Sequence, residues 1–456
     1  MKKMLALVMA LTVAVQLCAC AEVEKLKNVE LPPLPKVTAA AQAEPAATEA
    51  PAEQPTEEPA QETQAPQEAE ATEAPVVDEA AAEAMKRRVT VNFLKTEKLE
   101  YDPADGRQLI LSFSYVTPHV SIDERDHAAE AINEHLAMLE ETYYTGNDYG
   151  DGPSYGYYGM LEQAEDNFAY VHDSGSDLPV EFTASRDVSL ERADGRVLSF
   201  LFTEYLFTGG AHGMYGDRAY VYDTDSGELL TLDAITPDPE ALRAFLVRRM
   251  MEQVEQDEAL REEIDGYLLE RSREEALTAL LREGSWYLDE KGLVVFSDLY
   301  ELASYAAGMQ FFNFSYAELG ELLDPRFLPG VKRGEGGFDF LTMDEVEEGS
   351  FTILDKLTMD GVQELCLKSG ACVYDVAIRR AEYYDWSGSF GLGETLWYCS
   401  CMQNCGVQLT ADLPDGTPNL ALCYRSGEGE LHRCLLTQSG EDGHLMLLEE
   451  GLSFSE

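Results

Sequence analysis

One long segment of this chain is too polar and too rich in proline to fold. Residues 38–84 contain no lysine or arginine, and alanine, glutamate, proline, threonine and glutamine dominate them. The twelve acidic residues of this segment repel one another. It also has too little apolar surface to offset the entropy cost of ordering its backbone. We therefore expect residues 20–85 to form an extended, disordered linker, and the folded part to begin near Val89.

The amino terminus has the pattern of an export signal. Two lysines precede an apolar run from Leu5 to Leu17, which is too short to span a bilayer as a helix. The run ends in Leu17-Cys18-Ala19-Cys20, which resembles the lipobox of bacterial lipoproteins. That resemblance implies that residues 1–19 are a signal peptide and that lipid on Cys20 anchors the protein to the extracytoplasmic face of the cell membrane. The alternative is an ordinary secretory signal with a chance cysteine.

The charge balance restricts the possible partners. The chain has 33 lysines and arginines against 85 aspartates and glutamates, for a net charge of −52. Nucleic acid is excluded as a partner, because phosphate binding needs a basic surface. The long-range field of such a chain would attract a cationic partner. The same charge can also serve only to keep an exposed surface solvated.

Residues 86–330 alternate between two periodicities. Alternating apolar and polar residues predict strands, and apolar residues spaced three to four apart predict helices. The predicted strands are 89–94, 108–116, 180–185, 197–207, 219–223, 229–232, 286–288, 293–296 and 309–314. The predicted helices are 123–143, one within 160–170, one that begins near 237–239, 273–281 and 316–322. This pattern indicates an α+β fold with a mainly antiparallel sheet and packed helices, divided into parts 86–195 and 196–330.

The remaining residues, 331–456, have a different character. Short apolar runs are separated by turn sequences such as Pro414-Asp415-Gly416 and Ser426-Gly427-Glu428-Gly429. We therefore expect a C-terminal β-rich module.

Two motifs in the middle of the chain resemble a known family. The first is TEYLFTGGAHGMYGDRAYVYDTDSGELLTLD at 203–233, and the second comprises YELASYAAG at 300–308 with FNFSYAEL at 312–319. Together they resemble the extracellular domain of lysozyme-sensing anti-sigma factors, and also the non-catalytic N-terminal region of some peptidoglycan deacetylases. The resemblance covers roughly residues 89–325. It implies an α+β domain that binds a lysozyme-like cationic protein.

Not every property of those relatives can apply to this chain. If Cys20 is the first mature residue, no cytoplasmic segment exists to hold a sigma factor, so anti-sigma activity is not expected. The metal-binding motifs of the deacetylases, an Asp-Asp pair and H-x-x-x-H, are not found in the sequence. The expected part is therefore the non-catalytic surface domain.

Glycines and tyrosines provide the candidate binding residues. Gly209 and Gly210 permit positive φ angles and a tight corner beside His212, which is either a structural residue or a ligand contact. A Gly/Tyr-rich stretch nearby offers rings of the kind that bind protein surfaces or stack on sugars, although half or more of them can equally belong to a core. These rings are Tyr143, Tyr144, Tyr155, Tyr157 and Tyr158.

All seven cysteines after Cys20 lie in the C-terminal module. Outside the cytoplasm such cysteines usually form disulfides. Cys423 and Cys434 lie almost symmetrically about a turn, so we predict that they pair. The alternatives are a metal site on Cys399-x-Cys401-x-x-x-Cys405, whose spacing matches no common zinc motif, and a catalytic cysteine. We expect no metal and no cofactor.

These observations together favour a non-catalytic binding or sensing lipoprotein of the cell envelope. Its expected ligand is a lysozyme-like cationic protein or peptidoglycan. The alternative is an envelope enzyme with thiol- or metal-dependent chemistry in residues 331–456. A lipoprotein that only spaces or decorates the wall is a third possibility.

Overall fold

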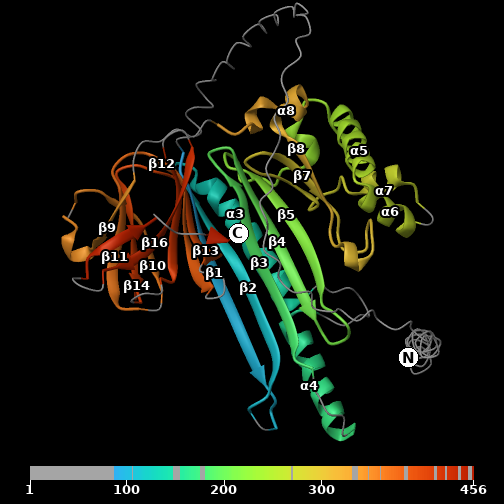
Figure 1. The fold of residues 1–456 in the computed structure, drawn as a ribbon, viewed down its shortest axis with the longest axis horizontal. Helices are drawn as coiled ribbons and strands as arrows, with labels where there is room; N and C mark the ends of the chain where they lie inside the picture. The colour runs from blue at the N-terminus through green and yellow to red at the C-terminus, as the bar shows by residue number, and fades with distance from the viewer. Residues whose placement is uncertain are drawn as a thin grey trace, which may run out of the picture. The chain divides into compact units, whose positions relative to one another are not determined.

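The computed structural model describes residues 87–455 except 105, 147–154, 175–179, 269–270, 331–336, 348, 360, 385–388, 415–417, 427–428, 440–442 and 450–453. Cys20, the predicted signal peptide and the predicted linker therefore lie outside the described residues. The predicted fold class is confirmed: large, mainly antiparallel sheets carry several helices, and the C-terminal part is rich in strands (Figure 1). Among the described residues, no helix combines the length and the apolar character needed to cross a membrane.

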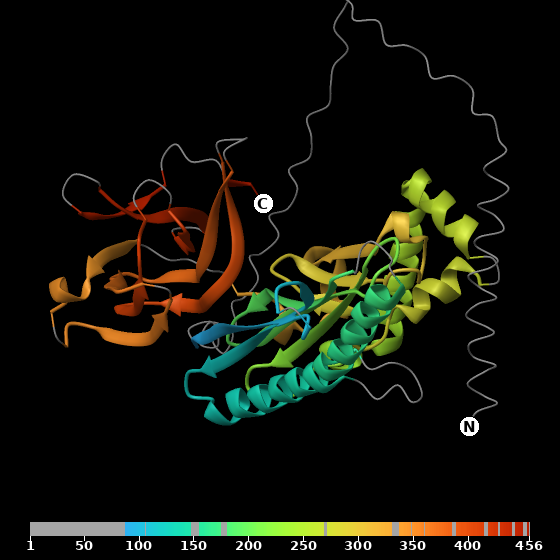
Figure 2. The ribbon, with the colours of Figure 1, turned by 90° about the horizontal axis from the view of Figure 1, so that it is seen from below.

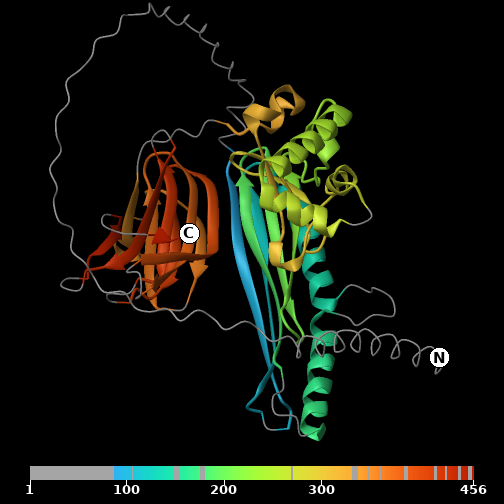
Figure 3. The same cartoon turned by 45° about the vertical axis from the view of Figure 1, so that its right-hand side comes forward.

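The first part of the fold is a sheet with two helices on one face. Its elements are β1 (Val89–Tyr101), β2 (Leu109–Ile122), α3 (Asp126–Thr145), α4 (Tyr157–Ser174), β3 (Phe182–Ala193), β4 (Val197–Phe207) and β5 (Met214–Asp223). Strands β2 and β3 are parallel, while the other neighbouring pairs are antiparallel. A parallel pair needs a long crossover, and α3 and α4 provide it. Both helices lie along the sheet (Figures 2 and 3).

Helix α3 packs on the sheet through a regular apolar stripe. Its buried residues are Ala128, Ala129, Ile132 and Leu136, which recur at the spacing of one helical face. They belong to a core with Val91, Val120 and Phe200 of the sheet. The helix was predicted from this spacing, and the structure confirms it.

A helical region with its own small sheet follows β5. It comprises η1 (Leu232–Ile235), α5 (Pro239–Gln256), α6 (Glu258–Tyr267), α7 (Arg273–Ala279), β6 (Trp286–Leu288), β7 (Gly292–Phe296), η2 (Tyr305–Ala307), β8 (Phe311–Ser315), α8 (Tyr316–Leu319), η3 (Gly320–Leu322) and η4 (Pro325–Phe327). Strands β6, β7 and β8 form an antiparallel three-stranded sheet. Apolar residues of α5 and of this small sheet share one core with Leu201 and Val221 of the large sheet.

Two predictions in this region were wrong. The predicted strand 229–232 forms only an isolated bridge between Tyr222 and Leu229 before the chain turns into η1. Helix α6 was not predicted, although Leu260, Ile264 and Leu268 recur every four residues and pack against the same core. It begins after Asp257, whose side chain accepts a hydrogen bond of 3.0 Å from the backbone N–H of Leu260.

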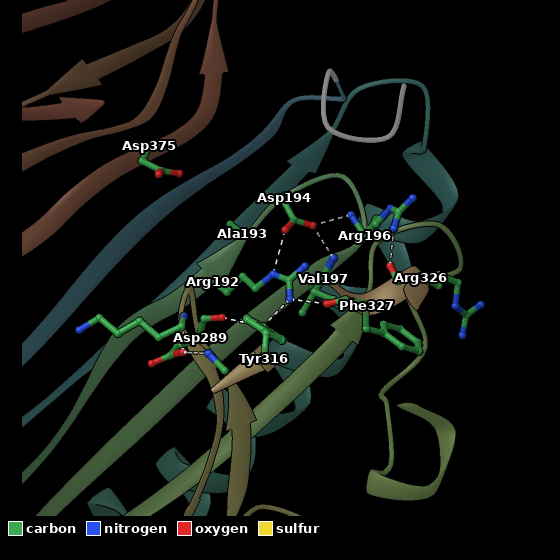
Figure 4. Close-up of polar contacts among 12 residues, drawn as sticks. Arg192, Ala193, Asp194, Arg196, Val197, Asp289, Tyr316, Arg326, Phe327 and Asp375 are labelled. Atoms are coloured by element: carbon green, nitrogen blue, oxygen red, sulfur yellow. Dashed lines mark hydrogen bonds and ion pairs between the residues drawn. The ribbon is translucent and has the colours of Figure 1, made fainter. Parts of the chain in front are cut away.

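A buried arginine joins the end of this region to the large sheet (Figure 4). Arg192, at the end of β3, donates from Nε to Asp194 at 2.8 Å and from Nη1 to Tyr316 Oη at 2.7 Å and to the Phe327 carbonyl at 2.6 Å. Asp194 also accepts hydrogen bonds from the backbone N–H groups of Arg196 and Val197, which closes the turn between β3 and β4. One charged pair therefore holds both the turn and the segment around η4.

The C-terminal part is built almost entirely from strands. They are β9 (Phe338–Thr342), β10 (Thr352–Thr358), β11 (Gln363–Ser369), β12 (Val373–Tyr384), β13 (Ser389–Met402), β14 (Cys405–Ala411), β15 (Leu420–Ser426), β16 (Glu430–Gln438), β17 (Leu445–Leu448) and β18 (Phe454–Ser455), with η5 (Met343–Glu345) after β9. Four of them form a separate sheet in the order β10-β14-β11-β9. Its β10–β14 pair is parallel, so this part is not a simple antiparallel meander.

The other C-terminal strands extend the large sheet. Strand β13 pairs with β1 through Thr90, Val91 and Asn92, so the sheet order runs β17-β16-β15-β12-β13-β1-β2-β3-β4-β5. The predicted boundary at residues 195/196 falls in the turn between the paired strands β3 and β4. One sheet thus includes strands from all three predicted folded parts, and the domain boundaries stay a prediction.

Candidate functional site

The two sequence motifs of the middle region meet at one end of the β4–β5 hairpin. His212 stacks on Tyr305 with ring centroids 3.7 Å apart, and Tyr305 Oη donates to the Gly213 carbonyl at 2.9 Å. Further contacts join Tyr205 to Tyr215 at 4.8 Å and Tyr300 to Tyr305 at 5.8 Å. We call these five rings the hairpin aromatic cluster: Tyr205, His212, Tyr215, Tyr300 and Tyr305.

Glycines shape the backbone beneath the cluster. Gly209 and Gly210 have φ angles of +94° and +107°, a region that favours glycine, so the predicted tight corner is present. Gly213 is required for a different reason, because a Cβ at this position would overlap the ring of Tyr205. His212 itself is exposed, and its Nδ1 lies 3.0 Å from the Gly213 carbonyl oxygen. The corner therefore presents the imidazole ring to Tyr305 and to solvent.

Two tyrosines of the cluster are strongly exposed. Tyr215 is 47% exposed and Tyr300 is 41% exposed, and Met214 beside them also faces solvent. Tyr300 has a positive φ of 62°, which is uncommon for a residue with a side chain, and its carbonyl accepts a hydrogen bond from Tyr267. Four of these rings were not predicted as binding residues: Tyr205, Tyr215, Tyr300 and Tyr305. Their position within the two quoted motifs could have indicated them.

The tyrosines predicted from the Gly/Tyr-rich stretch lie elsewhere, near the α3–α4 connection. Tyr144 and Tyr157 stack at 5.3 Å, and Lys98 Nζ lies 4.5 Å from the centroid of the Tyr157 ring. Tyr157 is buried, Tyr143 and Tyr144 are half-buried, and Tyr155 and Tyr158 are exposed. The hydrogen bond from Lys98 lowers the pKa of Tyr144. Three of these five tyrosines, Tyr143, Tyr144 and Tyr157, thus belong to a small hydrophobic core, which was the alternative to a binding surface.

Two of these tyrosines border a cavity. Tyr143 and Tyr155 contribute to its lining together with Arg186 of β3 and Glu204 of β4. Neither charged residue was predicted from the sequence as part of a site.

The predicted disulfide between Cys423 and Cys434 is not formed. The register of β15 and β16 pairs Cys434 with Leu422 and Cys423 with Arg433. This offset of one residue turns the two side chains to opposite faces of the sheet. All seven cysteines from Cys366 to Cys434 are free thiols. Two of them, Cys372 and Cys401, have their Sγ atoms 3.5 Å apart.

The six buried thiols are poorly suited to act as nucleophiles. Burial raises the pKa of Cys366 to about 11 and the pKa values of Cys399 and Cys434 to about 12. The thiolate is the reactive form, so a raised pKa lowers reactivity at neutral pH. In the part of the chain that the structure describes, no group of three or more His, Cys, Asp or Glu residues is arranged to hold a metal ion.

Comparison with known proteins gives a domain but no function. Residues 234–317 match the model of a family described as a protein of unknown function, DUF3298. We call this matched segment the DUF3298-like domain. This domain contributes Tyr300 and Tyr305 to the hairpin aromatic cluster, while Tyr205, His212 and Tyr215 precede it. No curated protein matches the sequence.

Two solved structures of DUF3298 proteins are similar to this chain. A family member from Bacteroides fragilis NCTC 9343 is 15% identical with a TM-score of 0.39, and the match covers 52% of this chain and 94% of that one. A family protein from Pseudomonas aeruginosa PAO1 is 20% identical with a TM-score of 0.35, covering 53% of this chain and 96% of that one.

Proposed function

We propose that this protein is a non-catalytic binding or sensing module of the cell envelope whose hairpin aromatic cluster binds a lysozyme-like cationic protein. Lipid on Cys20 would anchor it to the extracytoplasmic face of the membrane, and residues 20–85 would hold the folded part away from the bilayer. The observation that carries the proposal is the meeting of two separate motifs in one exposed group of rings, marked by the 3.7 Å stacking of His212 on Tyr305.

The composition of this surface fits a protein partner. Tyrosines are enriched at the centres of protein interfaces, where a rigid ring contributes contact area and its hydroxyl group contributes a hydrogen bond. An arginine or lysine of the partner can also lie over a tyrosine ring. The net charge of −52 would speed the approach of a cationic protein. The resemblance to lysozyme-sensing domains points to the same class of partner.

The proposal is tested by binding of the full chain to egg-white lysozyme over a series of salt concentrations. The full chain is required because β1 pairs with β13 of the C-terminal part. We expect a saturable one-to-one complex with a submicromolar Kd that persists at moderate salt. Binding that disappears as salt rises would mean only general attraction between an acidic and a basic protein.

Substitutions test the location of the binding surface. Changing Tyr215 and Tyr300 together to serine should weaken lysozyme binding more than tenfold if they are central contacts, since such residues typically contribute at least 2 kcal/mol. The matched control is Tyr383→Ser, because Tyr383 is similarly exposed at 46% but lies on β12. Equal affinities for all three proteins would reject the hairpin aromatic cluster. Binding to soluble peptidoglycan fragments without lysozyme binding would instead identify a glycan ligand.

A further inference from the structure

A cavity remains between the helices and the sheet of the first part of the fold. It has a volume of about 370 Å³ and lies between the C-terminal end of α3, the beginning of α4 and strands β3, β4 and β5. This volume is within the range of sites that hold small molecules, roughly 300–1,000 Å³. Its walls combine rings with three charged residues, Arg186, Glu204 and Arg218. The residues that matter here are Tyr143, Tyr155, Arg186, Phe202, Glu204 and Tyr220.

Arg186 is a buried cation with incomplete hydrogen bonding. It is only 3% exposed, and its Nη1 donates to the Leu139 carbonyl at 2.8 Å. The guanidinium carbon lies 4.6 Å from the centroid of the Tyr143 ring and 5.3 Å from that of Phe202. Among the described residues, neither Nε nor Nη2 has a hydrogen-bond partner. Buried donors without a partner are rare in folded proteins, so these two require an explanation.

Glu204 attracts Arg186 electrostatically but makes no hydrogen bond to its two free donors. Glu204 is directly opposite Arg186 in the β3–β4 register, and the next strand has Gly216 in the same row. Yet Glu204 accepts no hydrogen bond from Nε or Nη2, because both lack partners. Burial raises the pKa of Glu204. Arg192, six residues further along β3, differs in that Asp194 pairs with its Nε at 2.8 Å, although its Nη2 also lacks a hydrogen-bond partner among the described residues.

The two free donors of Arg186 have a defined geometry. Nε and Nη2 lie on the same edge of a guanidinium group, and this edge can donate two parallel hydrogen bonds to the two oxygens of one carboxylate. The Tyr143 hydroxyl, which also lines the cavity, has no partner among the described residues either. The surrounding rings offer flat apolar faces to the rest of a ligand.

We propose that this cavity binds a small ring-bearing carboxylate, whose two oxygens accept hydrogen bonds from Nε and Nη2 of Arg186. The ring of the ligand lies against the aromatic walls formed by Tyr143, Phe202 and Tyr220. Tyr205 belongs both to the lining of this cavity and to the hairpin aromatic cluster, but the cavity takes a small anion rather than a cationic protein. A failure of lysozyme binding would therefore not contradict this proposal, and a failure of carboxylate binding would not contradict the proposed function.

The test uses the full chain and three acids, each matched with a neutral counterpart. Benzoate is compared with benzamide, cyclohexanecarboxylate with cyclohexanecarboxamide, and glucuronate with glucose, by ligand-observed NMR and calorimetric titration at neutral pH. At least one acid should bind at least tenfold more tightly than its neutral counterpart. If no acid is preferred over its counterpart, the proposal is wrong.

Two substitutions locate the binding to the cavity. Arg186→Met removes the donors but keeps an apolar side chain of similar length, and it should weaken binding of the preferred acid at least tenfold without lowering the melting temperature. Glu204→Gln removes a negative charge that competes for Arg186, so it should tighten binding severalfold. Glu228→Gln removes the same charge from an exposed turn after β5 and should have no effect.

The outcomes separate a binding residue from a structural one. If Arg186→Met unfolds the protein, Glu204→Gln still decides, because only a carboxylate site beside Glu204 gains affinity from that change. Unchanged affinity in Glu204→Gln together with unchanged affinity or lost stability in Arg186→Met would overturn the proposal.

Discussion

Arg192 is completely buried, and each of its hydrogen bonds joins β3 to another part of the chain. Asp194 neutralises it at 2.8 Å, while Tyr316 and the Phe327 carbonyl accept from Nη1. Tyr316 in turn donates to the Asp289 carbonyl at 2.7 Å. Removing one partner of a buried ion pair leaves the other charge without compensation, which costs far more than the loss of an exposed pair.

Replacing Asp194 with asparagine should therefore destabilise the protein by about 3–5 kcal/mol. The asparagine Oδ1 can still accept the hydrogen bonds from the turn, but its amide nitrogen cannot accept from Arg192 Nε, so the change removes both the charge and that hydrogen bond. The measurement is the free energy of unfolding in urea at pH 7. Asp233→Asn is the matched control, since it removes an exposed partner of Arg243 and should cost less than about 1 kcal/mol. Similar losses in both variants would contradict the assignment of Arg192 as a buried charged link.

At the scale of elements, α3 is held to the sheet by polar contacts as well as by its apolar stripe, and one of these contacts involves a histidine. His135 lies 2.9 Å from the Tyr222 hydroxyl of β5, and its ring meets the rings of Tyr220 and Tyr222 edge to face. Burial lowers the pKa of His135. The folded protein therefore favours the neutral imidazole.

This contact predicts a loss of stability at acidic pH. In the unfolded chain His135 takes up a proton near pH 6.5, whereas the folded protein resists that proton until a lower pH. The stability that neutral His135 gives the folded protein is fully present above about pH 6.5 and declines as the pH falls below that value. His135→Gln should flatten this part of the stability profile, measured by urea unfolding between pH 8 and pH 5. His127→Gln, at an exposed position of the same helix, should leave the slope unchanged.

At the scale of the whole molecule, strand β1 joins the C-terminal strands to the rest of the sheet. Beyond its pairing with β13, Asn92 Nδ2 donates to Asp355 at 2.6 Å, and Tyr398 Oη donates to Asp375 at 2.7 Å and to the Ala193 carbonyl at 3.2 Å. Tyr398 also belongs to the core beneath α3. The C-terminal part thus covers an edge of β1 that would otherwise have unpaired backbone groups.

Removal of residues 331–456 should therefore leave a protein that self-associates. The exposed edge of β1 can pair with another copy, so sedimentation should show larger species at higher protein concentration, together with a lower melting temperature. Tyr398→Phe keeps every strand paired, and it should cost about 1–2 kcal/mol without self-association. A shortened chain that stays monomeric and equally stable would mean that residues 86–330 fold independently.

Local pattern was sufficient to predict many single elements. The predicted strands 197–207 and 286–288 have the bounds that β4 and β6 show, and the apolar spacing after residue 123 led to α3. These predictions succeeded because the side-chain period of a strand or helix is set by its own backbone geometry. The tight corner at Gly209 and Gly210 was predictable for the same reason, since the tolerance of positive φ angles is a property of glycine itself.

Long-range register and burial were decided only by the tertiary structure. No local pattern indicates that Val91 pairs with Tyr398 or that Cys434 lies opposite Leu422, and an error of one residue in register reverses the face on which a side chain lies. The sequence alone determined the fold class, most of the elements and the two motifs that meet in the hairpin aromatic cluster. The buried, unpartnered Arg186 could not be anticipated, because its neighbours come from α3, β3 and β4, and only packing of these elements excludes water from its guanidinium group.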